Sequence, residues 1–205
     1  MSKQDQLGFD VLLQDAAADN AARIFARETA HLPDTWEDAL VFHRNQINEH
    51  HAAMLATDFD GALAIRNDAH LLATKLNGGK PGILAGDDAP GCRLDTLARA
   101  PNGEVPLWGQ SGYFEIEAAG MTARIDMGGM FGIGATAMPF LGFAARAALR
   151  DKPFLSETGY RSFLGVTVTP ERGMDTAGFV RRVIEVYVDT ELRGKLVQID
   201  PKWSK

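Results

Sequence analysis

The chain has 205 residues, of which 45% are hydrophobic and 23% are charged. These values are ordinary for a globular protein and argue against global disorder. The formal net charge of −6 gives no strong nucleic-acid signal, because it disfavours a protein that binds mainly by neutralising phosphates. With Cys92 as its single cysteine and no signal-peptide or membrane-span pattern, we expect a cytoplasmic protein with no membrane partner.

The N-terminal part of the chain predicts three helices. Apolar residues recur at helical spacing over 8–30, 36–57 and the segment that follows the break at 58–60. Thr35 has the position of an N-cap for the second helix, and the glycines in 77–79 end the third. Short breaks between helices favour an antiparallel helical layer.

The rest of the chain predicts turns and strands, followed by one more helix. Glycine and proline punctuate residues 78–112, where we expect short strands or turns packed on the core. Period-two alternation on both sides of Ala119-Gly120 predicts a hairpin of two strands, 113–118 and 121–127. Further elements are expected at 163–169 (strand), 175–190 (helix) and 196–199 (strand).

This order of elements predicts an α+β fold, in which about three N-terminal helices pack on a mostly antiparallel C-terminal sheet with one later helix. We expect a single compact domain over 1–205. Its parts are a helical segment (about 8–77), a Gly/Pro-rich packed connection (about 78–112) and a strand-rich segment (about 113–200).

The densest group of polar side chains lies near residue 160. Arginine binds carboxylates and phosphates bidentately, hydroxyls donate and accept, and a glycine turn lets the backbone approach a ligand. The candidate ligand-binding residues are Ser156, Glu157, Thr158, Gly159, Tyr160, Arg161 and Ser162. The alternative interpretation is a capped turn before a strand, with Glu157 and Arg161 as a structural ion pair.

A second candidate site is a divalent metal centre. His43 and His50 share one helix face but lie two turns apart, about 10 Å from the rise per residue, so a metal would need ligands from other segments. The candidate ligands are His43, His50, His51, Asp58, Asp60 and His70. Hydrogen-bonded histidines in a seam between helices are the alternative.

The run Asp58-Phe59-Asp60-Gly61-Ala62-Leu63 resembles the nucleophile motif of the haloacid-dehalogenase-like phosphatases, Asp-x-Asp-Gly-Thr-Leu. The resemblance implies a nucleophilic Asp58, an acid/base Asp60 and a bound Mg²⁺. It covers only these residues and the acidic Gly86-Asp87-Asp88. Ala62 replaces the threonine, and the preceding residues have a helical pattern where that family has a buried strand.

A third polar group lies on the hairpin, where Glu115 and Glu117 are predicted to share a strand face near Arg124 and Asp126. Paired carboxylates suit acid/base chemistry if they are buried, whereas a solvent-facing hairpin surface is the simpler interpretation.

Three hypotheses about function follow from these patterns. The first is a non-enzymatic binding or regulatory module, with no cofactor, for a small anionic ligand or the acidic group of a protein partner. The second is a metal-dependent hydrolase or phosphatase that uses Asp58, Asp60 and the histidines. The third is a structural or assembly protein, in which the alanine-rich helices form the seam of a homodimer.

Overall fold

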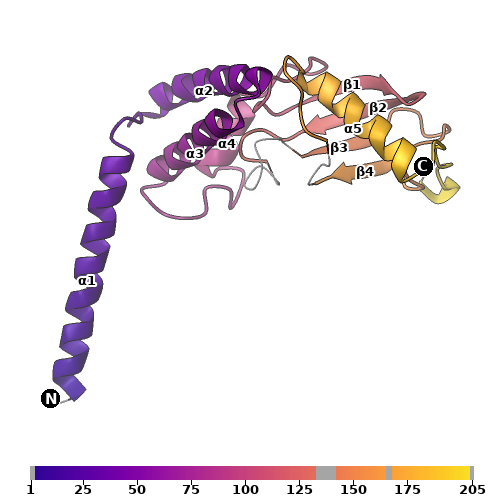
Figure 1. Ribbon diagram of the computed structural model, residues 1–205. Coiled ribbons are helices and arrows are strands. Elements are labelled where there is room, and N and C mark those ends of the chain that lie inside the picture. Colours follow the sequence, from indigo (N-terminus) through magenta and orange to yellow (C-terminus); the bar gives the residue numbers. More distant parts are fainter. Residues whose placement is uncertain (1–2, 133–141, 165–167, 204–205) are drawn as a thin grey trace.

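The computed structural model describes residues 3–132, 142–164 and 168–203, with side chains described from residue 16 onward (Figure 1). In chain order the elements are α1 (Lys3–Glu28), α2 (Trp36–Ala56), α3 (Phe59–Leu76), α4 (Pro90–Leu97), β1 (Gly112–Ala118), β2 (Met121–Met127), β3 (Phe143–Ala147), β4 (Tyr160–Phe163), α5 (Thr176–Thr190) and a 3-10 turn (Pro201–Trp203). The predicted α+β class is confirmed.

The starts and ends of the N-terminal helices follow from local hydrogen bonds. The Thr35 hydroxyl accepts from the Asp38 backbone N–H at 3.2 Å and so caps α2, as predicted. Helix α2 ends at Thr57, whose φ of 61° is left-handed. One residue later the Asp58 carboxylate accepts from the Gly61 N–H at 3.0 Å and begins α3.

Helix α1 extends away from the other helices and the sheet (Figure 1). Its C-terminal end is attached to α3 through Lys75, whose ammonium group donates to the carbonyl of Thr29 at 3.1 Å and to that of Leu32 at 2.6 Å. One turn before this end of α1, Ile24 keeps 40% of its surface exposed. The body of the fold therefore begins close to Thr29.

The four strands form an antiparallel sheet in the order β1-β2-β3-β4. Burial alternates strictly along β1, as a sheet covered on one face requires. Helix α5 lies across the buried face, where Phe179 and Ile184 are fully buried in the same cluster as Phe114 and Ile125 (Figure 1). The opposite face carries polar side chains and is called the open face below.

Helices α2, α3 and α4 enclose a second apolar cluster, which includes Leu72, Leu94 and Phe131. Trp108 connects the two parts of the fold. Its backbone N–H donates to His51 of α2 at 3.1 Å, while its indole N–H donates to the Met174 carbonyl at 2.9 Å, close to the start of α5. The helical layer and the sheet are thus joined by a buried, hydrogen-bonded aromatic residue.

Some predicted elements need correction. The segment 78–112 contains helix α4 where only strands or turns were expected, because a proline at the first helical position and turn-forming flanks concealed a short helix. Strand β4 begins at Tyr160, three residues before the predicted start, and its described part ends at Phe163; residues 165–167 of the predicted strand lie outside the described residues. Residues 196–199 contribute one isolated bridge, Phe154 with Val197, in place of a strand.

Strand β3 was not predicted, since Phe143–Ala147 is short and rich in alanine. Among the helices that the structure describes, none is long and apolar enough to cross a membrane.

Candidate functional site

The predicted polar run around residue 160 divides between the two faces of the sheet. Tyr160 lies opposite Arg146 on the open face. Arg161 lies opposite the buried Ala145, and its guanidinium carbon is 4.6 Å from the centre of the Tyr187 ring of α5. Because consecutive strand side chains point to opposite faces, Tyr160 and Arg161 cannot converge on one small ligand.

The turn before β4 uses its hydroxyl groups internally. Ser156 Oγ donates to the Tyr160 carbonyl at 2.7 Å, and Thr158 Oγ1 accepts from the Tyr160 N–H at 3.3 Å. Gly159 has a φ of +69°, which the tight turn requires. Glu157 is exposed, and no ion pair joins it to Arg161 in the described part of the chain. These contacts agree with the alternative interpretation of this run as a capped turn.

The open face has two rows of side chains that cross the strands. The arginine row is Glu115, Arg124, Arg146 and Tyr160, in the order β1 to β4. The aspartate row is Tyr113, Asp126, Ala144 and Ser162. The two rows lie side by side across the sheet, so residues far apart in sequence form one surface.

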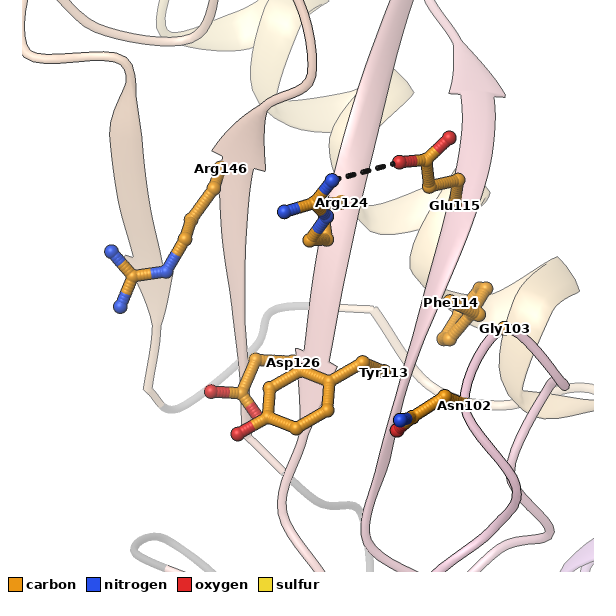
Figure 2. Close-up of a pocket in the computed structure, with 8 residues that line it drawn as sticks. All are labelled: Asn102, Gly103, Tyr113, Phe114, Glu115, Arg124, Asp126 and Arg146. Carbon is orange, nitrogen blue, oxygen red and sulfur yellow. Dashed lines mark hydrogen bonds and ion pairs between the residues drawn. The ribbon is translucent and has the colours of Figure 1, made fainter.

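Two arginines are direct cross-strand partners in the arginine row. Arg124 pairs with Arg146 in the sheet register, an arrangement that brings like charges close together. The Arg124 guanidinium turns toward Glu115 and forms an ion pair at 3.3 Å. The Arg146 guanidinium turns away from Arg124 (Figure 2) and lies 4.7 Å from the centre of the Tyr160 ring. Arg146 forms no ion pair with any carboxylate whose side chain the structure describes.

The aspartate row places a half-buried carboxylate beside these arginines. Burial raises the pKa of Asp126, and the positive charges of Arg99 and Arg146 oppose that shift. The guanidinium of Arg99 lies 4.9 Å from the centre of the Tyr113 ring. Burial also raises the pKa of Asp95, and the charge of Asp126 adds to this shift.

A hollow of about 790 Å³ lies over this part of the sheet (Figure 2). It is lined by Asn102, Gly103, Tyr113, Phe114, Glu115, Arg124, Asp126 and Arg146. Its volume is in the range of small-molecule sites, and its lining combines aromatic surface with two cationic and two acidic groups. Such a surface can bind a charged ligand without any contribution from the turn at 156–159.

The candidate metal ligands have separate structural roles. His51 accepts a hydrogen bond from Trp108, and His70 Nε2 is 3.2 Å from the Met130 carbonyl oxygen. Asp58 caps α3. Across the described ranges, no three histidine, cysteine, aspartate or glutamate residues gather as a metal site would require.

The phosphatase motif also differs in its surroundings. Asp58 follows helix α2, and Asp60 lies in the first turn of α3, so no strand precedes the motif. The acid-rich segment 86–88 lies in turns before α4. The arrangement needed for attack on phosphorus, with a strand end presenting the nucleophile, is therefore lacking in the described residues around Asp58.

His43 and His50 are almost completely buried on the inner side of α2. Burial lowers the pKa of each from 6.5 to about 4. The His43 ring lies 5.4 Å from the Phe131 ring, measured between centres. Both imidazoles are thus neutral at pH 7 and belong to the interior of the helical layer. The hydrogen bonding expected of histidines in a seam is incomplete among the described residues, because His43 Nδ1 and both ring nitrogens of His50 are buried there without a partner.

Sequence reasoning missed Arg99, Arg146 and Tyr113 as site residues. The hairpin pattern placed Glu115 and Arg124 together, and this was the available signal for the open face. Arg146 could not be added to it because its strand was not predicted.

The chain is similar to Protein KlcB of Escherichia coli, with 30% identity over 182 residues. The match covers 85% of this chain and 44% of KlcB. A second Escherichia coli protein of the same name is 36% identical over 130 residues, which is 56% of this chain and 27% of that protein. The chain thus spans less than half the length of these curated relatives. No model of a protein family matches the chain, and no solved structure matches it.

Proposed function

We propose that this protein is a non-enzymatic binding module that holds a small acidic group, a carboxylate or a phosphate, on the open face of its sheet. The principal contact is Arg146, with Arg124 beside it. The observation that carries the proposal is the cross-strand pairing of these two arginines at a hollow of about 790 Å³.

The charges of the arginine row support this proposal. Glu115 neutralises Arg124 at 3.3 Å, whereas Arg146 stacks on Tyr160 and forms no ion pair with the described residues. A guanidinium stacked on an aromatic ring is held in one orientation, so less conformational freedom is lost when it binds an anion. An acidic ligand between the two arginines also relieves their mutual repulsion.

The proposal is tested by calorimetric titration of the wild-type chain and of Arg146→Gln. The probes are inorganic phosphate and N-acetyl-glycyl-phenylalanine, which offers one carboxylate and no cation. We expect at least one probe to bind the wild-type protein, and Arg146→Gln to weaken that binding about 10- to 150-fold, because a charge-assisted contact is worth about 1.5–3 kcal/mol.

Arg182→Gln is the matched control. It removes one exposed arginine from α5, on the other side of the sheet, and is expected to leave binding unchanged. Equal loss in both variants would mean that only net charge matters, and binding of neither probe to the wild-type protein would contradict the proposal.

A second candidate function, assembly through a helical seam, is favoured by the projection of α1 from the fold (Figure 1). Ile24 is 40% exposed there, and an isolated helix gains little stability without packing. Sedimentation of the full chain tests this function: a dimer that Ile24→Asp dissociates supports it, and a monomer at every concentration contradicts it.

A further inference from the structure

We infer that the acidic ligand of the open face also carries a cationic group, so that the site takes a small amphoteric molecule of the size of a short peptide with free ends. This inference rests on the proposed function, because it names the ligand class of the same site. It is carried by Asp126, a carboxylate that lines the hollow together with Arg146.

The four charged side chains that line the hollow differ in whether they belong to an ion pair. Glu115 and Arg124 neutralise each other through their ion pair. Within the described residues, neither Arg146 nor Asp126 belongs to an ion pair, although Arg146 is close enough to affect the charge of Asp126. The hollow therefore offers one cation and one carboxylate to a ligand.

Arg99 does not serve as the ion-pair partner of Asp126. Its positive charge acts on Asp126, but its guanidinium lies over the Tyr113 ring at 4.9 Å and forms no ion pair in the described part of the chain. A ligand with negative charge alone would bring that charge beside Asp126, which costs binding energy. A ligand with both an ammonium and a carboxylate group gives Asp126 a partner of opposite charge and gives Arg146 one as well.

The sheet register separates the two residues that would hold the charges of the ligand. Asp126 pairs with Ala144, which is two residues before Arg146, so Asp126 and Arg146 are diagonal neighbours. The backbone positions of diagonal neighbours lie about 7–8 Å apart, and the Arg146 side chain turns further away, toward Tyr160 of β4. The two ends of a dipeptide reach over a longer span than the ammonium and carboxylate of one α-amino acid, so a dipeptide suits these two side chains better.

The test is a calorimetric titration of the full chain with three forms of one dipeptide. These are glycyl-phenylalanine, N-acetyl-glycyl-phenylalanine and glycyl-phenylalanine amide. We expect the free dipeptide to bind about tenfold more tightly than either blocked form. Asp126→Asn should remove this advantage over the acetylated form, while Arg146→Gln should remove the advantage over the amide.

Glu117→Gln is the control for Asp126→Asn, since it removes an exposed carboxylate from the same face outside the residues that line the hollow. Circular dichroism of each variant establishes that it is folded. If the acetylated form binds as tightly as the free dipeptide and still requires Arg146, the inference is overturned and the proposed function stands. If neither phosphate nor the acetylated dipeptide binds the wild-type protein, the proposed function and the inference that rests on it are both overturned.

Discussion

Tyr160 and Arg161 are consecutive residues of β4 that stack on partners at opposite faces of the sheet. Tyr160 lies under the guanidinium of Arg146, 4.7 Å from its central carbon, on the open face. Arg161 lies on the covered face, where its guanidinium carbon is 4.6 Å from the centre of the Tyr187 ring of α5. In the proposed function the first contact holds Arg146 for ligand binding, whereas the second attaches β4 to α5.

Replacing Arg161 with alanine tests this assignment. We expect Arg161→Ala to lower the free energy of unfolding by about 0.5–1 kcal/mol, because an exposed cation–π contact with Tyr187 is lost together with a longer one to Phe163 at 6.0 Å. Its affinity for phosphate or N-acetyl-glycyl-phenylalanine should equal that of the wild-type protein. Urea denaturation and calorimetry measure the two quantities. Loss of binding without loss of stability would mean that Arg161 takes part in ligand binding.

Acid should destabilise the protein through His43 and His50. Both have a pKa of about 4 when folded and an ordinary value of 6.5. Between these values the unfolded chain binds more protons than the folded one, so stability is complete above pH 6.5 and falls as the pH drops toward 4. A pKa difference of this size corresponds to about 3 kcal/mol at most for each histidine.

Urea denaturation at a series of pH values from 7.5 to 4 measures this effect. His31→Gln is the matched control, since His31 is half exposed and lies near Asp68 at 3.4 Å. The variant should lose stability over the same pH range as the wild-type protein. A free energy of unfolding that stays constant between pH 6.5 and 4.5 would be inconsistent with buried neutral histidines.

Asp58 should behave as a helix cap. Asp58→Ala removes the acceptor for the Gly61 N–H and is expected to cost about 1 kcal/mol of stability, whereas Asp58→Ser retains an acceptor and should cost less. Thermal unfolding of both variants with and without Mg²⁺ measures this. A magnesium-dependent stabilisation that both substitutions abolish would favour the hydrolase hypothesis instead.

Alanine substitutions at two glycines distinguish the cost of backbone strain from the cost of a steric clash. Gly103 and Gly109 share a φ of +88°, so alanine is strained at both positions. A Cβ at Gly103 meets open space, but at Gly109 it would lie 2.8 Å from His50 Nδ1. Gly109→Ala should therefore cost about 1–3 kcal/mol more than Gly103→Ala. Equal losses in chemical denaturation would mean that the loop at Gly109 moves away from α2 freely.

The sequence predicted those elements whose signals are local. The hairpin of β1 and β2 was predictable because alternation and a glycine turn act within 15 residues, and the structure pairs Glu115 with Arg124 accordingly. The cap at Thr35 was equally local. Helix α4 and strand β3 are too short for a periodic pattern to emerge, and their conformation depends on packing against the rest of the fold.

The site was less predictable, because it depends on where strands begin and how they pair. Starting β4 at Tyr160 instead of Phe163 changes the polar run from one cluster into side chains on two faces. Arg146 joins Arg124 only through the register of β2 with β3, which the pattern of either segment alone does not specify.

The most direct test of the central claim is a map of backbone amide shifts by NMR during titration with N-acetyl-glycyl-phenylalanine. We predict that shifts concentrate at Tyr113, Arg124, Asp126, Arg146 and Tyr160, and that Arg146→Gln moves their titration to at least tenfold higher ligand concentration while Arg182→Gln does not. Shifts confined to residues 156–159 and Arg161, or shifts that saturate at the wild-type concentration in Arg146→Gln, would contradict binding on the open face.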